Sequence, residues 1–182
     1  MEKWVLAAIC FVTITHMKLQ LRMLPEIYVV SVSIKGFVNT REVIWTYSTT
    51  KISEARCRYD VMRSIQEMFI TFNRTVLYSG QRITTDLLRR FSRRREERMY
   101  IIRRGRTLSS ETIFYKAPDS SCAVIVLKSM IQNRSWYGDL RVRNSSITKD
   151  LFPECERRFA QLARCGRVIY SPSCSQELRD TL

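Results

Sequence analysis

The segment from Ser121 to Cys174 decides the fold and reads SCAVIVLKSMIQNRSWYGDLRVRNSSITKDLFPECERRFAQLARCGRVIYSPSC. It begins with a continuous apolar run at residues 122–127, and a second short run follows from Tyr137 to Val142. Runs of this length and composition, separated by polar turn residues, predict two neighbouring β-strands. The β-favouring residues Val168–Tyr170 then precede the last cysteine, so the segment predicts two strands, a connecting element and an extension that a disulfide could fix.

The connecting element is a predicted helix over residues 151–165. Cys155, Phe159, Leu162 and Cys165 are spaced four, three and three residues apart and therefore share one helical face. Pro153 suits a first helical turn, and Gly166 suits a C-terminal cap.

Further strands are expected upstream of this segment. Five stretches have suitable β propensity or alternation: residues 42–49, 56–65, 67–76, 99–102 and 111–116. Trp45 is expected to be a core residue at the closed end of a barrel, with a ligand-stacking role as the alternative. Residues 25–38 could form either a strand or a short helix. The chain therefore predicts an all-β protein of about eight antiparallel strands with a C-terminal helix.

Several short motifs resemble the salivary lipocalins of ticks, the family that includes the histamine-binding proteins. The matching pieces are IWTYSTT (44–50), ARCRY (55–59), CAVIV (122–126), GDLRVRNSSI (138–147), FPEC (152–155) and RVIYSPSC (167–174). The resemblance implies an eight-stranded antiparallel lipocalin-type barrel with the C-terminal helix packed outside it. It also implies a secreted protein that sequesters small host mediators.

The chain contains six cysteines, and spacing alone leaves their pairing open. The resemblance implies one disulfide between Cys57 and Cys174 and another between Cys122 and Cys155. Cys165 is then expected to be a free or intermolecular thiol.

The N-terminus favours secretion. An apolar run from Trp4 to Ile14 is shorter than the roughly 20 residues that a membrane span needs, but it suits a signal-peptide core. The alternative is a buried N-terminal strand. We expect residues 1–20 to be a signal peptide and residues 21–182 to form one barrel domain without stable membrane insertion. Three glycosylation sequons, at Asn73, Asn133 and Asn144, favour the same extracellular compartment.

No catalytic constellation is evident. His16 is the only histidine and would leave with the signal peptide, which excludes serine–histidine and cysteine–histidine mechanisms and imidazole metal ligands. Cys-x-x-Cys, Gly-x-Gly-x-x-Gly and phosphate-loop patterns are also absent. We therefore expect a protein that is not an enzyme and that uses no cofactor or metal.

Residues 89–106 form a basic stretch with nine arginines and two glutamates, in a chain of formal net charge +14. One interpretation is a solvated hairpin or loop. The other is an electropositive surface for an anionic glycan, an anionic membrane or an acidic ligand. A nucleic-acid partner is not expected, because the sequence contains no recognition module. An extracellular glycan-binding or protein-binding module that acts through this stretch is the alternative to a barrel ligand.

A barrel of eight strands can hold one small ligand, so inward side chains should form the site. The strand placement suggests a candidate set: Tyr47, Tyr59, Phe69, Tyr100, Glu111, Phe114 and Asp139. In the amine-binding relatives an acidic residue stands where this chain has Ala123, and Glu-Leu-Trp stands where it has Asp139-Leu140-Arg141. Glu111 and Asp139 could hold one amine such as histamine or serotonin, or they could be solvent-facing acids at the rim. A fatty-acid derivative such as a leukotriene is the other expected ligand, with Arg141 or one of residues 103–106 as its partner.

Overall fold

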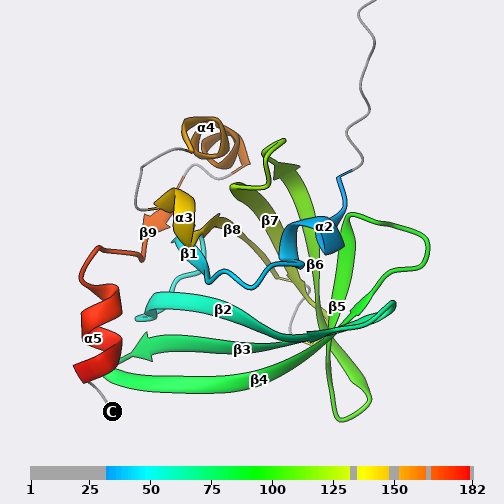
Figure 1. The fold of residues 1–182 in the computed structure, drawn as a ribbon, viewed down its shortest axis with the longest axis horizontal. Coiled ribbons are helices and arrows are strands. Elements are labelled where there is room, and N and C mark those ends of the chain that lie inside the picture. Colours follow the sequence, from blue (N-terminus) through cyan, green and yellow to red (C-terminus); the bar gives the residue numbers. More distant parts are fainter. Residues whose placement is uncertain (1–31, 132–134, 148–151, 163–164, 181–182) are drawn as a thin grey trace, which may run out of the picture. The chain divides into compact units, whose positions relative to one another are not determined.

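The structure is a computed structural model that describes residues 32–131, 135–147, 152–162 and 165–180. Its main feature is one antiparallel sheet that curls into a closed barrel (Figure 1). Eight strands form the wall in chain order: β1 (Ile44–Thr49), β2 (Arg56–Ile65), β3 (Phe69–Tyr78), β4 (Gln81–Phe91), β5 (Arg98–Arg103), β6 (Arg106–Lys116), β7 (Cys122–Ser129) and β8 (Trp136–Arg143). The expected eight-stranded barrel is confirmed.

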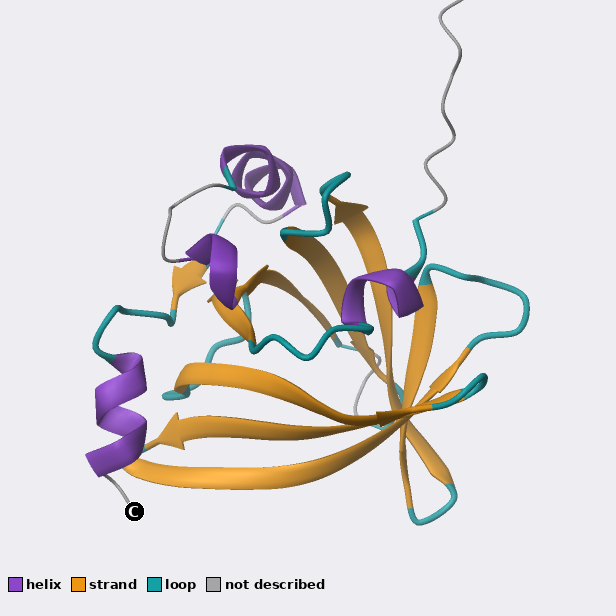
Figure 2. Cartoon of the chain, viewed as in Figure 1, coloured by secondary structure: helices purple, strands orange, loops and turns teal. Residues whose placement is uncertain are grey.

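The first strand closes the barrel. β1 pairs with β8 along its length, and Ile44 and Trp45 also pair with β2. Where β2 has diverged, the short strand β9 (Arg167–Val168) takes the other edge of β1 and pairs with Ser48 and Thr49. The wall is therefore continuous from β2 through β8 and back to β1 (Figure 2).

Two separate clusters of buried side chains occupy the two faces of this wall. The inner cluster includes Ile70, Phe72 and Ile125, and the helix α2 (Ile34–Val38) adds Ile34 and Phe37 to it. Ser33 begins α2 as its N-cap, because its hydroxyl accepts a hydrogen bond from the backbone N–H of Gly36. The helical alternative for residues 25–38 thus holds for Ile34–Val38, while residues 25–31 lie outside the described part of the chain.

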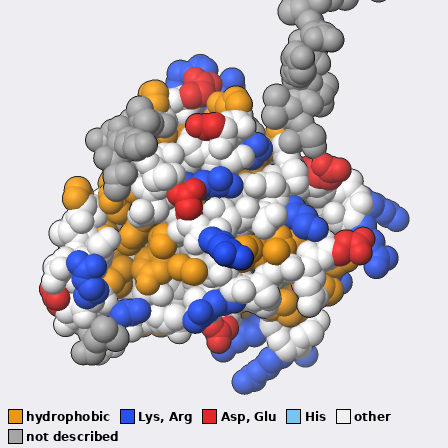
Figure 3. Space-filling view, viewed as in Figure 1, with side chains coloured by type: hydrophobic (Ala, Val, Ile, Leu, Met, Phe, Trp, Pro, Cys, Tyr) orange, Lys and Arg blue, Asp and Glu red, His pale blue; other side chains and the backbone are white. Residues whose placement is uncertain are grey.

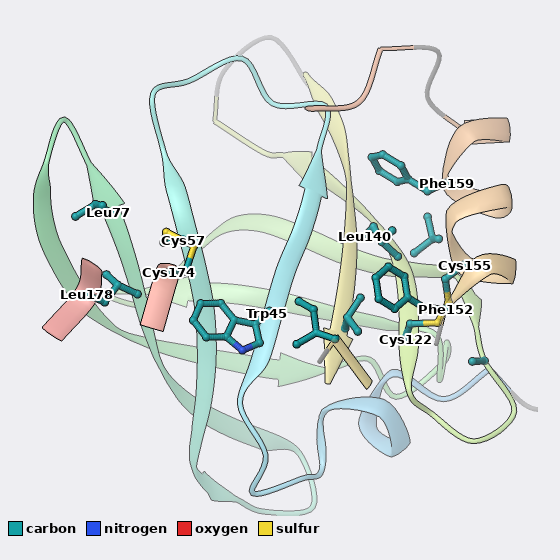
Figure 4. Packing of buried hydrophobic residues seen from close by; sticks show 14 residues of the cluster. Trp45, Cys57, Leu77, Cys122, Leu140, Phe152, Cys155, Phe159, Cys174 and Leu178 are labelled. Carbon is teal, nitrogen blue, oxygen red and sulfur yellow. A yellow bond between two sulfur atoms is a disulfide. The ribbon is translucent and has the colours of Figure 1, made fainter. Parts of the chain in front are cut away.

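The outer cluster packs between the barrel wall and the C-terminal elements (Figure 4). Trp45 belongs to it: the residue is buried, as expected, but it lies on the outer side of β1 and not in the barrel interior. Its indole N–H donates to the side-chain oxygen of Asn144, at 2.9 Å, in the short helix α3 (Asn144–Ile147). A tryptophan at this position therefore joins the wall to its outer layer.

The predicted C-terminal helix is observed as α4 (Pro153–Leu162), which begins at the expected proline. It buries Cys155 and Phe159 against the outside of the barrel. A side chain at Gly166 would come within 2.4 Å of the Phe159 ring, so the close approach of the chain there requires glycine. The predicted helix and its buried face are confirmed, although α4 is shorter than the predicted span of residues 151–165.

Two disulfides fix the outer layer. One joins Cys57 of β2 to Cys174, which begins the last helix, α5 (Cys174–Asp180), and the other joins Cys122 of β7 to Cys155 of α4. These are the two pairs that the resemblance implies. Cys165 is free and exposed.

The sequence did not predict β4 or α5. Strand β4 pairs with β3 from residue 81 to residue 90, but only residues 88–91 pair with β5. Thr84, Thr85 and Asp86 are all exposed, so this half of the strand lacks the apolar face that a sequence pattern needs. The expected signal peptide lies outside the described residues, and none of the described helices is long and apolar enough to cross a membrane.

Candidate functional site

The barrel interior contains a cluster of charged side chains beside its cluster of apolar residues. Its members alternate along their strands with outward-facing residues, as the pleat of a strand requires. They are Arg58 and Asp60 of β2, Arg74 of β3, Arg89 of β4, Glu111 of β6, and Asp139 and Arg141 of β8. We call these seven residues the interior ionic cluster.

Glu111 lies at the centre of the cluster and is fully buried. Arg141 binds it with both terminal nitrogens, at 2.9 Å to Oε2 and 3.1 Å to Oε1. Arg89 donates to the same Oε1 at 3.1 Å, and its guanidinium lies 4.5 Å from the centre of the Phe72 ring. Glu111 is therefore held by three charge-assisted hydrogen bonds, the strongest type that a carboxylate forms in a protein.

The other two carboxylates are also engaged by arginines. Arg74 binds Asp60 with two parallel hydrogen bonds of 2.7 and 2.8 Å. Asp139 lies 2.6 Å from a terminal nitrogen of Arg58 and 3.3 Å from one of Arg141, and it accepts a 2.7 Å hydrogen bond from the Thr49 hydroxyl.

The arginines keep the carboxyl groups of Glu111 and Asp60 ionised in spite of their burial. Burial acts to raise the pKa of Glu111, but the charges of Arg141, Arg89 and Arg74 outweigh it and lower the pKa to about 2. The pKa of Asp60 is likewise well below its usual value, because Arg74 and its neighbours overcome the effect of burial. Burial lowers the pKa of the Arg89 guanidinium, and its carboxylate neighbours offset this only in part.

The cluster carries an excess of one positive charge, since four arginines face three carboxylates. It also contains N–H groups that the protein does not satisfy. Arg89 Nε and Nη1 and Arg141 Nε have no hydrogen-bond acceptor among the described residues, although both side chains are at most 2% exposed. A buried donor without an acceptor costs about 1–3 kcal/mol, so these groups favour an acceptor from outside the protein.

The candidate residues from the sequence fall into two groups. Glu111, Asp139 and Arg141 come together in the interior ionic cluster. The aromatic candidates lie elsewhere: Tyr47 packs on Phe152 in the outer layer, Tyr59 packs on Trp45, and Phe69 and Phe114 are exposed. Tyr100 lines a separate pocket on the outside of the wall.

Sequence reasoning missed Arg58, Asp60, Arg74 and Arg89 as site residues. A weak signal existed in β2, where Arg58 and Asp60 alternate with outward residues on one strand. Charged residues at alternate positions usually indicate a solvent-exposed face, and only the closure of the barrel turns this face inward.

The sequons lie outside the site. Asn73 is half-buried on β3, and Asn144 is exposed at the start of α3. Asn133 lies outside the described residues. Glycosylation of any of the three stays a prediction.

No family model and no curated protein matches the sequence. Solved structures do match: the siderocalin Ex-FABP aligns with 72% of this chain and 93% of its own, at 12% identity and a TM-score of 0.59. Insecticyanin from the tobacco hornworm Manduca sexta aligns with 79% of this chain and 84% of its own, at 8% identity and a TM-score of 0.57. Lobster apocrustacyanin A1 aligns with 85% and 86%, at 12% identity and a TM-score of 0.55.

These solved structures share the architecture of this chain, a closed antiparallel barrel of eight strands with a helix packed outside. The chain has the lipocalin fold. At identities of 8% and 12% the likeness establishes the fold alone.

Proposed function

We propose that this chain is a secreted lipocalin that sequesters a small amphipathic mediator with an anionic head group, such as a leukotriene or another fatty-acid derivative. The observation that carries the proposal is the excess of arginine in the barrel, with unsatisfied N–H groups on Arg89 and Arg141. A carboxylate is the acceptor that such guanidinium groups bind best. The head group would add the negative charge that the interior ionic cluster lacks.

An amine is the less favoured ligand. Glu111 and Asp139 would have to bind it, but both already accept hydrogen bonds or ion pairs from arginines. An ammonium group would therefore enter beside like charges and would compete with Arg141 for the same oxygens. Ala123, where the amine-binding relatives carry an acid, is buried on the inner side of β7 and offers no charge.

The extracellular setting and the salivary role rest on different support. Two disulfides indicate an oxidising compartment. The order of the short motifs from residue 44 to residue 174 supports a place among the tick salivary lipocalins that scavenge host mediators. The proposed function is binding and release, without catalysis, cofactor or metal.

The test compares two ligands that differ only in the head group. Calorimetric titration of the mature protein with a leukotriene and with its methyl ester should give a Kd for the ester that is about ten- to a hundred-fold higher, because a charge-assisted hydrogen bond is lost. Histamine and serotonin should bind much more weakly. Equal affinity for acid and ester would contradict the head-group site, and tight histamine binding without leukotriene binding would replace it with an amine site.

Asp139→Asn sharpens the same test. It removes a negative charge beside Arg58 and Arg141 and should leave leukotriene affinity intact or improve it, whereas an amine site would be weakened. Asp180→Asn, on the exposed surface of α5, is the matched control. Thermal unfolding of both variants must show a folded protein before the affinities are compared.

A further inference from the structure

The structure divides the basic stretch 89–106 into three parts with different environments. Arg89 points into the barrel and belongs to the interior ionic cluster. Arg103, Arg104 and Arg106 lie at the exposed turn between β5 and β6. The remaining five arginines gather where β4 ends, in the loop 92–97, and where β5 begins.

These five arginines line one pocket on the outer surface, with a volume of about 620 Å³. They are Arg90, Arg93, Arg94, Arg95 and Arg98. The side chains of Phe69 and Tyr100 also line it and supply flat apolar walls. We call this hollow the arginine pocket. In Figure 3, Lys and Arg side chains project at the right edge of the molecule, where Figure 1 places the loop between β4 and β5, and acidic side chains lie near them.

Local hydrogen bonds hold the loop that forms the arginine pocket. The backbone N–H of Ser92 donates a 3.0 Å hydrogen bond to the carbonyl of Arg98. The Ser92 hydroxyl accepts a 3.2 Å hydrogen bond from the backbone N–H of Arg95. The carbonyl of Glu96 accepts a bond from Ile34 of α2, which fixes the far side of the loop. The guanidinium groups are therefore presented on a defined backbone, which reduces the entropy lost on binding.

The charges of the arginine pocket are not neutralised from within. None of its five arginines forms an ion pair with a described residue, although Arg98 donates to the Thr112 hydroxyl and Arg90 lies over the Tyr100 ring. Glu96 and Glu97 lie in the same loop but do not line the pocket. Five like charges around one hollow repel one another, and an anion with several charges would relieve that repulsion.

We propose that the arginine pocket binds a sulfated glycosaminoglycan segment of the heparan type. Sulfate oxygens match the planar guanidinium fork, and repeated sulfates on one flexible chain can reach several arginines at once. The volume falls in the range of pockets for small molecules, so the arginine pocket would hold a short part of the glycan chain while the rest extends over the surface. A lipid bilayer fits less well, because its head groups form a flat surface that cannot enter a hollow lined by Phe69 and Tyr100. This site would hold the carrier near cell-surface glycans while the barrel remains free for its own ligand.

The experiment measures binding of a heparin hexasaccharide to the full mature chain by calorimetry at about 150 mM salt, where weak long-range attraction is screened. The triple variant R93S, R94S, R95S should weaken binding by roughly ten-fold or more, because three charge-assisted contacts are lost. The matched triple variant R103S, R104S, R106S removes the same charge from the β5–β6 turn and should change the Kd by less than about three-fold. All six positions are exposed or at strand ends, so both variants should keep the parent melting temperature.

Desulfated heparin of the same length is the ligand control, and it should bind at least about ten-fold more weakly than heparin. If the two triple variants weakened heparin binding equally, the net charge of the protein and not the arginine pocket would explain the binding, and the proposal would be overturned. Equal binding of desulfated heparin, or binding to phosphatidylserine vesicles without binding to heparin, would overturn it as well. Leukotriene affinity should be the same in both triple variants and the parent, so failure of this proposal leaves the barrel proposal standing.

Discussion

The two faces of one strand show how differently the two sides of this barrel wall are built. On β8, Leu140 and Val142 point outward into an apolar layer that α4 covers. Asp139 and Arg141 alternate with them and point inward into the interior ionic cluster. The outer face resembles the core of an ordinary small domain, whereas the inner face buries charges that apolar residues could replace at lower cost.

This difference separates the residues that specify the fold from those that make a site. The outer layer excludes water from apolar side chains and is fixed by two disulfides, both of which join the wall to a C-terminal element. The interior ionic cluster requires every charge to meet its partner, and Arg89 and Arg141 still keep unsatisfied N–H groups. A stabilising core has no need of such groups, which is the physical reason to assign function to the inner face.

The largest expected effect comes from removing the disulfide that ties α5 to β2. It closes a sequence separation of 117 residues. Replacing Cys57 and Cys174 by serine should lower the free energy of unfolding by about 4 to 5 kcal/mol, because the unfolded chain gains the freedom of a long loop. Urea denaturation of the double variant measures this loss. Cys165→Ser, at the free and exposed cysteine, is the control and should unfold like the parent. A double variant that is as stable as the parent would show that the outer layer does not depend on this bond.

The outer layer was largely predictable from the sequence. Strand β7 is buried on both faces, with Val124 outside and Ile125 inside, and it therefore appears as the continuous apolar run CAVIVL. The face of α4 follows from the four-residue and three-residue spacing of Cys155, Phe159 and Leu162. In these segments the hydrophobic pattern of the sequence matches the burial of the side chains, so the pattern was sufficient to predict the element and its buried face.

The inner face could not be predicted in the same way. The partners of Glu111 come from β3, β4 and β8, and their meeting depends on the register of the whole barrel. Arg89 is fully buried while the next residue, Arg90, is exposed, yet the sequence shows only two adjacent arginines. Pairing across strands that are distant in sequence leaves no local periodic signal. For the same reason β4, with polar residues on both faces, was not recognised as a strand.

A substitution at the centre of the interior ionic cluster tests how much the inner face depends on complete pairing. Glu111→Gln keeps the shape of the side chain but removes the carboxylate nearest to Arg89 and Arg141, which leaves four arginines facing two carboxylates. We expect a loss of about 3 to 5 kcal/mol in the free energy of unfolding, because an uncompensated charge remains buried. Glu154→Gln removes a carboxylate from an exposed pair with Arg157 and Arg158 and should leave stability nearly unchanged. Similar results for the two variants would show that the interior ionic cluster is open to water.

The pH dependence of stability should distinguish the contribution of the inner face from that of the outer face, and it does so without a substitution in the interior ionic cluster. The pKa of Glu111 is lowered from 4.5 to about 2 in the folded protein, so its stabilising contribution is complete above pH 4.5 and is lost as the pH falls toward 2. The pKa of Asp60 is also lowered in the folded protein, so protonation of Asp60 adds to this loss of stability.

From the shift of Glu111 alone, stability should fall by about 2 kcal/mol between pH 7 and about pH 3, as urea denaturation at each pH would measure. Leu140→Ala opens a cavity in the outer layer and should cost about 2 to 5 kcal/mol at both pH values, because no titrating group is involved. Glu111→Gln should instead show a smaller loss between pH 7 and pH 3 than the parent, since the group that takes up the proton is gone. If its curve ran parallel to those of the parent and Leu140→Ala, the acid sensitivity would not come from Glu111, and the assignment of a lowered pKa to this carboxyl would be wrong.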